Sequence, residues 1–352
     1  MPSSPVNTLP LKKYAFVFCA GLLAVLGFAP WSVYPLVIFA LALLFWQWQH
    51  ASGKRAAAWL GFAFAAGLLS GGIGWIYIAL HDYGGMPFLL ALIATALYVA
   101  FVALVPACGG YVQAMLHTPV WARLVLVMPA LWVLMEWLRG LLFTGLPWLS
   151  VGYAQVPGSP LAGYSPILGV YGVSLLVAVS AGLLVLLWQA GWSKQGRVAL
   201  LVLVLLWGGG MALRAVEWTK AEGEPITVAL VQGNIPQELK FREEKLVSTL
   251  ENYQRLVLHS DARLIVLPET ALPLLRHELP ENYREILSKH ARRMGGDLLI
   301  GAFEREHGLY YNSVFTLGTA RRIAKAIAKT IWFRLASLSR CARCWAGLSM
   351  RY

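Results

Sequence analysis

Residues Arg263 to Thr270 read R-L-I-V-L-P-E-T, and this stretch decides how the second half of the chain is interpreted. The apolar run that ends at Leu267 is typical of a buried strand. Pro268 cannot donate a backbone hydrogen bond to a neighbouring strand, so we expect the strand to end there. Glu269 then lies at the carboxyl end of the strand, where α/β domains carry their active groups. A carboxylate partly shielded from water can act as a general base, and Glu269 is our candidate; the alternative is a surface carboxylate in a turn.

The sequence on either side of this stretch alternates between strand and helix patterns. Leu246, Leu250, Tyr253 and Val257 recur at helical spacing, which predicts one buried helix face. We predict an α/β layered domain from this order of elements. Its expected strands are Ile226–Asn234, Arg263–Leu267, Asp297–Phe303 and Tyr310–Leu317, and its expected helices are Arg242–Leu258 and Glu281–Met294.

The first 220 residues have the composition of a membrane domain. The whole chain is 58% hydrophobic and 13% charged, with a mean hydropathy of +0.62. This is far more apolar than a water-soluble protein of 352 residues requires. Residues 1–220 contain only three acidic residues, Asp82, Glu136 and Glu217. We predict about seven membrane-spanning helices, over residues 14–28, 33–48, 56–80, 88–112, 120–138, 167–190 and 198–213.

The positions of the basic residues predict the orientation of these helices. Short loops rich in Lys and Arg stay in the cytoplasm. Such residues precede the first span, and others lie between spans two and three, four and five, and six and seven. These positions share one side of the membrane, so residues from 214 onward are expected on the other side. In a bacterium with two membranes this places a multi-pass protein in the inner membrane with its C-terminal domain in the periplasm.

Three polar or aromatic features of the membrane half have more than one interpretation. Residues 140–165 contain Trp148 and several prolines and glycines, and form either an interfacial loop with anchoring aromatics or a vestibule for lipid. Glu136 and Arg139, three residues apart, predict an ion pair at the end of span five, although an ionisable group at this depth is also a functional candidate. His81 and Asp82 predict a solvated turn, because no further ligand follows at metal-binding spacing.

The net charge of +12 does not predict a nucleic-acid partner. Residues 319–352 contain eight Lys and Arg residues and no acidic residue, so the excess comes mainly from this segment and not from a folded basic face. The four cysteines, Cys19, Cys108, Cys341 and Cys344, show no disulfide framework. The last two form C-x-x-C without a second pair. We therefore expect no metal site and no cofactor.

Three segments together resemble the nitrilase-like domain of the apolipoprotein N-acyltransferase family. They are V-A-L-V-Q-G-N-I-P-Q at 228–237, L-P-E-T-A-L-P at 267–273 and Y-Y-N-S-V at 310–314. The preceding apolar helices fit the same family, and the resemblance covers roughly residues 10–318. It implies a polytopic α-helical membrane domain followed by an α/β nitrilase-like domain with an αββα sandwich, incomplete here.

The resemblance implies transfer of an acyl chain from a phospholipid, through a cysteine thioester, to the amino group of the diacylglyceryl-cysteine at an apolipoprotein N-terminus. The partners would be the phospholipid donor, the apolipoprotein acceptor and the bilayer, and we expect a monomer. Glu269 matches the family's general base. Phe241 stands where the family commonly has Trp, and with Trp148 it is a candidate substrate-binding residue.

The sequence departs from the family at two catalytic positions. The family has a Lys upstream of a V-P-F-G-E segment and a Cys within a C-Y-E segment, and neither segment occurs here. Lys325, Lys329, Cys341 and Cys344 lack these contexts. We predict three regions: a membrane domain at 1–220, the first part of a periplasmic nitrilase-like domain at 221–318, and a basic aberrant tail at 319–352.

This organisation leaves several hypotheses about function. A frameshift near residue 319 would explain the tail, and the chain would then be inactive; a basic amphipathic tail that lies on anionic lipid is the other interpretation. Two alternatives to the acyltransferase remain. One is a membrane-tethered C–N hydrolase that acts on amides. The other is a non-catalytic, degenerate polytopic membrane protein.

Overall fold

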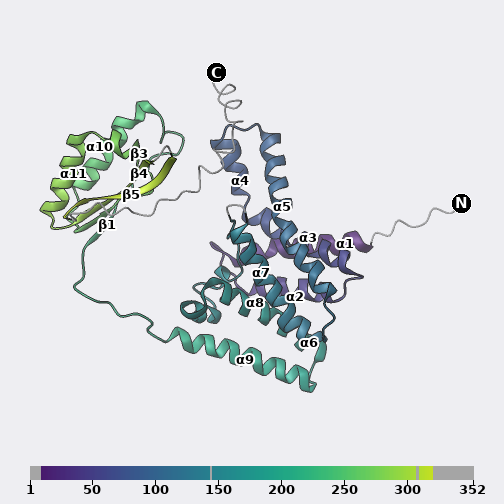
Figure 1. The fold of residues 1–352 in the computed structure, drawn as a ribbon. Coiled ribbons are helices and arrows are strands. Elements are labelled where there is room, and N and C mark those ends of the chain that lie inside the picture. The colour runs from purple at the N-terminus through teal and green to yellow at the C-terminus, as the bar shows by residue number, and fades with distance from the viewer. Residues whose placement is uncertain (1–8, 143–144, 307–308, 320–352) are drawn as a thin grey trace. The chain divides into compact units, whose positions relative to one another are not determined.

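The computed structural model describes residues 9–142, 145–306 and 309–319, and the chain divides into two compact units at Lys220 and Ala221. The first unit is helical and the second contains the sheet (Figure 1). Each unit is described by itself.

The helical unit places a helix over every segment that was expected to span the membrane. Among the described residues, four helices are long and apolar enough to cross a bilayer, and a fifth crossing exists if the bent pair described below counts as one span. The elements are α1 (Leu9–Ala24), η1 (Val25–Gly27), α2 (Pro35–Gln49), α3 (Lys54–Gly72), α4 (Trp75–Ile78), η2 (Ala79–Tyr83), α5 (Phe88–Met115), α6 (Val120–Ala122), η3 (Arg123–Val127), α7 (Met128–Leu141), η4 (Tyr153–Gln155), η5 (Pro160–Tyr164), α8 (Ser165–Ala190) and α9 (Lys194–Arg214).

The helix over the predicted span at residues 56–80 is bent, and whether the bent pair forms one span stays a prediction. The helix ends at Gly72 and resumes at Trp75, and the two parts are bent by 52°. Gly71, Gly72 and Gly74 lie at the break. Glycine is a poor helix former, so three of them within four positions explain why the helix gives way here.

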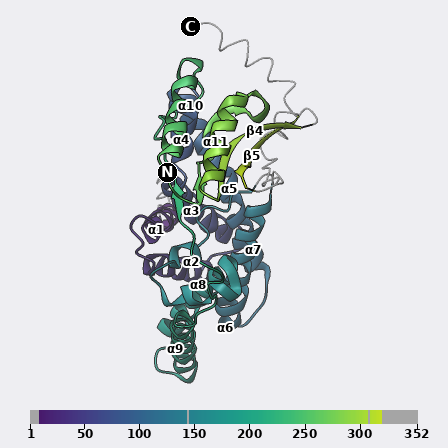
Figure 2. The same cartoon turned by 90° about the vertical axis from the view of Figure 1, so that its left-hand side faces the viewer.

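Close contacts through glycine hold α1 against α3. A Cβ atom on Gly21 would meet the Leu68 amide at 3.0 Å, and one on Gly67 would meet the Leu22 amide at 3.0 Å. The two helix backbones therefore touch where each presents a residue without a side chain, which is the usual way that membrane helices approach closely. At the edge of the unit, α9 contacts α8 and η5. Figure 2 shows α9 next to α8.

The second unit contains one five-stranded sheet. Its strands are β1 (Val228–Leu230), β2 (Leu264–Val266), β3 (Leu272–Leu275), β4 (Asp297–Glu306) and β5 (Leu309–Gly318). β1, β2 and β4 pair in parallel in that order, β3 pairs in parallel with β4, and β5 pairs with β4 in antiparallel fashion. The expected strands are all present, whereas β3 was not predicted. Its sequence, L-P-L-L, contains a proline and is too short to show alternation.

Two amphipathic helices, α10 (Glu243–Leu258) and α11 (Glu281–Arg293), cover one face of this sheet (Figure 1). Tyr253 and Val257 of α10 and Leu287 of α11 are buried against strand residues such as Ile265 and Ile300. Tyr253 and Val257 are two of the positions that the helical spacing predicted. Alternate strand residues point away from the helices, and among them Val228 and Leu230 of β1 and Val314 of β5 are exposed.

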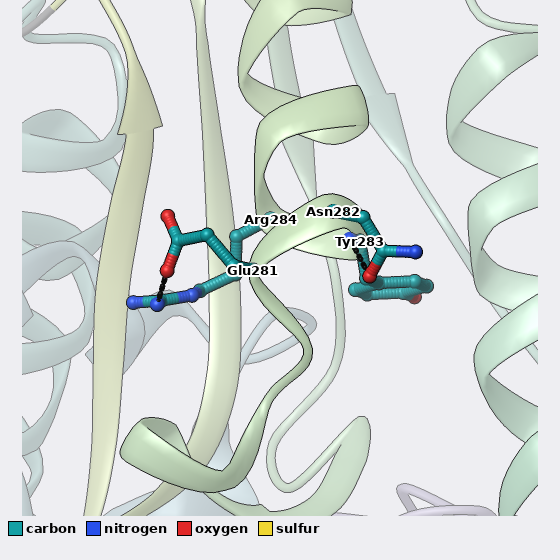
Figure 3. Close-up of polar contacts among 4 residues, drawn as sticks. All are labelled: Glu281, Asn282, Tyr283 and Arg284. Atoms are coloured by element: carbon teal, nitrogen blue, oxygen red, sulfur yellow. Dashed lines mark hydrogen bonds and ion pairs between the residues drawn. The ribbon is translucent and has the colours of Figure 1, made fainter.

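Polar contacts fix the first turn of α11. Glu281 and Arg284 form an ion pair, and the Asn282 side-chain oxygen accepts a hydrogen bond from the Tyr283 amide at 2.8 Å (Figure 3). The Tyr283 hydroxyl donates to the Leu250 carbonyl at 3.0 Å and ties α11 to α10. Burial raises the pKa of Tyr283, so this hydroxyl keeps its proton and remains a donor.

Candidate active site

The candidate site lies in a gap between two strands that share one neighbour. β2 pairs with the first residues of β4, through Leu264 and Asp297, and β3 pairs with later residues, through Leu272 and Ala302. Residues 268–271 lie between them and take no part in the ladder. This is the interruption that Pro268 predicted. The Leu267 amide makes the last contact before it, donating to the Leu299 carbonyl at 2.9 Å.

Gly301 of β4 lies directly against this interruption. A Cβ atom at Gly301 would stand 2.7 Å from the Thr270 amide nitrogen and 2.9 Å from the Glu269 Cα atom, and it would also meet the Pro268 carbonyl. Real Cβ atoms do not approach other atoms so closely. The turn that carries Glu269 therefore packs on β4 only because position 301 has no side chain.

Asn312 of β5 holds the Glu269 side chain. The Asn312 amide nitrogen donates to Glu269 Oε1, and the Thr270 hydroxyl donates to Asn312 Oδ1 at 3.3 Å. Thr270 is buried and has a φ of 51°, a strained conformation for a β-branched residue. Strain of this kind persists only where the surroundings impose it, and it is common at functional sites.

Lys240 is a second charged group at the turn, and it was not among the residues predicted from the sequence. Its ammonium donates to the backbone carbonyl of Glu269 at 3.3 Å. Partial burial lowers the pKa of Lys240, and the negative charge of Glu269 opposes that shift. Lys240 immediately precedes Phe241 in the sequence, so a signal was present. A single lysine in a polar segment, however, does not indicate which turn it will contact.

The two aromatic candidates have different surroundings. Phe241 is 59% exposed and its ring lies 6.2 Å from that of Phe303, the residue that pairs with Asn312 across β4 and β5. Phe241 is therefore close to the Glu269 turn. Trp148 belongs to the helical unit, is 49% exposed, and contacts Trp75 with ring centroids 6.1 Å apart.

The chemistry available at this turn is that of an oriented carboxylate with a cation beside it. Glu269 is exposed within the described part of the chain, so the expected shielding of this carboxylate from water is not seen. An oriented carboxylate can accept a proton from an attacking group. No group of three His, Cys, Asp or Glu side chains suited to a metal ion occurs among the described residues.

The comparisons with known proteins cover both units. The family model "Apolipoprotein N-acyltransferase N-terminal domain" matches residues 20–183, and the model "Carbon-nitrogen hydrolase" matches residues 227–342. A protein of Nitrosomonas europaea named apolipoprotein N-acyltransferase is 45% identical over 309 residues, which are 86% of this chain and 61% of the relative. Proteins of the same name from Chromobacterium violaceum and Methylococcus capsulatus are 40% and 38% identical, over 90% and 88% of this chain and 62% and 61% of their own lengths.

The chain belongs to the apolipoprotein N-acyltransferase family. It spans about three fifths of the length of the curated relatives it matches. The family resemblance predicted from the three segments is confirmed, as is the combination of apolar helices with a nitrilase-like domain. The hydrolase match extends to residue 342, beyond the boundary at 318/319 proposed from composition, and that boundary stays a prediction.

The family's nucleophile and lysine are not assigned by the structure. Cys19 and Cys108 are exposed on α1 and α5, two apolar helices. The other sequence candidates, Lys325, Lys329, Cys341 and Cys344, lie outside the described residues. The structure describes the surroundings of Glu269, and its role as the family's general base stays a prediction.

The predicted ion pair in the helical unit was wrong. Glu136 and Arg139 are both buried but form no ion pair, and among the described residues the guanidinium Nε and Nη2 atoms have no hydrogen-bond partner. The Glu136 Oε1 atom instead accepts from the Trp132 indole at 3.0 Å and from the Val151 amide at 2.9 Å. Spacing of three residues allows a pair, but here the fold directs the carboxylate to the loop after α7.

Proposed function

We propose that the fold of this chain serves phospholipid-dependent N-acylation of lipoproteins. The substrate pair would be a membrane phospholipid, which gives an acyl chain, and the diacylglyceryl-cysteine at the N-terminus of an apolipoprotein, which receives it. The chain would act as a monomer in a bacterial inner membrane, with the sheet unit in the periplasm. The family names of the relatives support the acylation of lipoproteins in general.

The observation that carries the proposal is the held carboxylate of Glu269. The turn that bears it is packed on Gly301 of β4 and is bound by Asn312 of β5 and by Lys240, which precedes α10. A surface glutamate in an ordinary turn requires no such support. Pre-organisation by neighbouring groups is the property expected of a general base.

The proposed reaction has two steps. In the first, a cysteine thiol loses its proton to Glu269 and attacks the ester carbonyl of the phospholipid; a C–S bond forms, the C–O bond breaks, and the lysophospholipid alkoxide leaves with the proton. In the second, the α-amino group of the acceptor attacks the thioester. A C–N bond forms, the C–S bond breaks, and the thiol is regenerated.

We further propose that this chain alone does not complete the reaction. It lacks the V-P-F-G-E segment, upstream of which the family has its lysine, and the C-Y-E segment that contains the family's nucleophile. The chain would then provide the membrane unit, the Glu269 turn and the aromatic surface at Phe241, and it would need a relative's remaining segment to become active.

A chimera tests this proposal. Residues 1–318 of this chain are joined to the part of the Nitrosomonas europaea relative that follows the corresponding position, and are expressed in bacteria depleted of their own N-acyltransferase. The readout is the number of acyl chains on lipoprotein N-terminal peptides by mass spectrometry. We expect three chains with the chimera and two with this chain alone. A chimera that is present in the membrane but leaves the peptides with two chains would contradict the proposal.

A second candidate function is hydrolysis of amides, because the sheet unit matches the carbon-nitrogen hydrolase model. The two functions differ in their need for phospholipid. A phospholipid with a labelled acyl chain should leave label on the purified chimera, in a form released by neutral hydroxylamine, if a thioester forms. Amide turnover without phospholipid, and without such label, would favour the hydrolase.

A further inference from the structure

Glu136 of α7 is a buried carboxylate that binds the backbone of a loop. Its Oε1 atom accepts a hydrogen bond from the Val151 amide at 2.9 Å and another from the Trp132 indole at 3.0 Å. The residue is only 4% exposed. An ionisable group buried among membrane helices is expensive, and it is a functional candidate together with the groups that bind it. Outside its own helix, Glu136 binds the loop that follows α7.

This loop, residues 146–152, is held at both ends as well. The Leu146 amide donates to the Arg139 carbonyl at 2.8 Å. The Gly152 amide donates to the Ser174 hydroxyl of α8 at 2.9 Å. Together with the bond to the buried carboxylate, these contacts fix the loop backbone against α7 and α8.

The middle of the loop is strained. Leu149 has a φ of 60°, a backbone conformation that is costly for a bulky residue. Its side chain packs at the end of α3, where a Cβ atom on Gly72 would overlap it. Strain of this kind persists only where the surroundings impose it, and it is common at functional sites. The bonds at the two ends of the loop and the contact with Gly72 are those surroundings.

The fixed loop presents an exposed aromatic ring. Trp148 is half-exposed, whereas Val151 is buried. The Trp148 ring contacts that of Trp75 edge to face, with the ring centroids 6.1 Å apart. Trp75 is also half-exposed and is the first residue of α4, directly after the bend. The two indole rings therefore form an exposed apolar surface where the loop meets α4.

An anchor at the membrane interface would explain two exposed indole rings, because Trp is enriched there. It would not explain the buried carboxylate or the strain at Leu149, since an anchoring ring needs no fixed position. A surface that receives a particular group does need one, and aromatic faces suit a fatty acyl chain.

We propose that Glu136 is a positioning residue, which holds Trp148 beside Trp75 by binding the loop backbone. The two rings contact an acyl chain of a lipid substrate, while Glu136 touches neither the substrate nor the reacting groups. The inference rests on the proposed function and adds to it the residue that orders this surface. The acyl chain belongs either to the phospholipid or to the diacylglyceryl group of the acceptor, and separate kinetic measurements distinguish the two.

Hydrogen exchange of the full chain, followed by mass spectrometry, tests the contact between Glu136 and Val151 without any need for activity. Glu136→Ala should speed exchange of the Val151 amide about tenfold or more, because a hydrogen bond to a carboxylate is lost. Glu136→Gln keeps an acceptor and should exchange nearly as the parent does. Peptides from α2 should exchange at the parent rate in both variants.

Two exchange results would overturn the proposal. One is unchanged exchange at Val151 in Glu136→Ala. The other is faster exchange throughout the helical unit, since Glu136 would then only stabilise the fold. An inactive parent chimera would instead contradict the proposed function and would leave the exchange result standing.

Kinetics of the chimera test what the ordered rings do. Glu136→Ala and Trp148→Ala should each raise the KM for a lipid substrate about three- to tenfold, the range expected for one lost aromatic contact, with kcat nearly unchanged. The KM for phospholipid and the KM for diacylated lipopeptide are measured separately, and the one that rises identifies the source of the acyl chain. Glu136→Gln should keep both KM values near those of the parent.

A double variant and a control separate positioning from general stability. Glu136→Ala combined with Trp148→Ala should be no worse than Trp148→Ala alone, because the loop position matters only through the ring. Ser180→Ala is the control, since Ser180 of α8 is another buried acceptor for an indole, that of Trp207, and both KM values should stay unchanged. Additive losses in the double variant, constant KM values with a lower kcat, or the same rise in KM in Ser180→Ala would overturn the proposal.

Discussion

Asn312 of β5 donates its side-chain amide to the carboxylate of Glu269, which lies 43 residues earlier in the turn between β2 and β3. The antiparallel pairing of β4 with β5 sets Asn312 opposite Phe303, two residues along β4 from Gly301. Sheet register thus brings the amide to the carboxylate. The orientation of the candidate base depends on the strand that follows β4 as well as on its own turn.

Replacing Asn312 with Ala should reduce the activity of the chimera by about tenfold or more, because hydrogen bonds to charged groups contribute about 1.5–3 kcal/mol. Val314→Ala, two residues along on the same face of β5, is the matched control and should leave activity near that of the parent. The measurement is the initial rate of N-acylation of a diacylated lipopeptide. Equal losses in both variants would mean that Asn312 acts only through strand stability.

Gly301→Ala should destabilise the sheet unit by about 1–3 kcal/mol, the usual cost of overpacking. The new methyl group would overlap the backbone of residues 268–270. Thermal unfolding of the full chain gives the stability, and activity of the chimera gives the effect on Glu269. Gly208→Ala, where a Cβ atom meets no atom of the described residues within 4 Å, is the control and should not lower the Tm. An unchanged Tm and rate for Gly301→Ala would refute the packing described for the turn.

Lys240 predicts a dependence of stability on pH. Its pKa in the folded chain is lowered below the ordinary value of 10.5, so between the two values the unfolded chain binds more protons. The free energy of unfolding contributed by Lys240 therefore rises as the pH increases through the lowered pKa toward 10.5. When the free energy of unfolding is measured with denaturant between pH 8 and 10, it should rise less with pH in Lys240→Gln than in the parent.

Lys245→Gln is the control for that profile. Lys245 is exposed on α10, and its replacement should leave the pH slope as it is in the parent. Comparing variants with the parent removes the contributions of Tyr253 and Tyr283, which are common to all three chains. If the free energy of unfolding of Lys240→Gln changes with pH in the same way as that of the parent, Lys240 is not buried against the Glu269 turn.

Phe241→Ala should raise the KM of the chimera for phospholipid by about three- to tenfold, with a smaller effect on kcat. The aromatic pair with Phe303 contributes about 0.5–1.5 kcal/mol beyond its buried area, and the exposed face of Phe241 offers a surface for an acyl chain. Phe241→Trp should restore the parent KM. If kcat falls and KM stays constant in Phe241→Ala, the residue positions the turn instead of contacting the lipid.

The sequence predicted the elements of the sheet unit because their patterns are local. Alternation and helical spacing identified β4, β5, α10 and α11 within a few residues, and Pro268 marked the end of β2. The same local pattern identified Glu269 as the residue after the strand. β3 was missed because four residues with a proline give no period.

The contacts around Glu269 could not be predicted, because they depend on register between strands that are far apart in the sequence. Nothing in Y-Y-N-S-V shows which residue Asn312 will meet, and nothing in G-A-F shows that Gly301 supports a turn. In the helical unit, spacing predicted an ion pair between Glu136 and Arg139. The loop after α7 binds the carboxylate instead, which only the three-dimensional structure reveals.

The most direct test of the account is Glu269→Gln in the chimera, assayed by mass spectrometry of lipoprotein N-termini in depleted cells. Glutamine keeps the shape and the contact with Asn312 but cannot accept a proton as a base. The account predicts that the parent chimera adds the third acyl chain and that Glu269→Gln, present in the membrane at the same level, leaves lipoproteins with two. Lipoproteins with three acyl chains in cells that contain Glu269→Gln would contradict it.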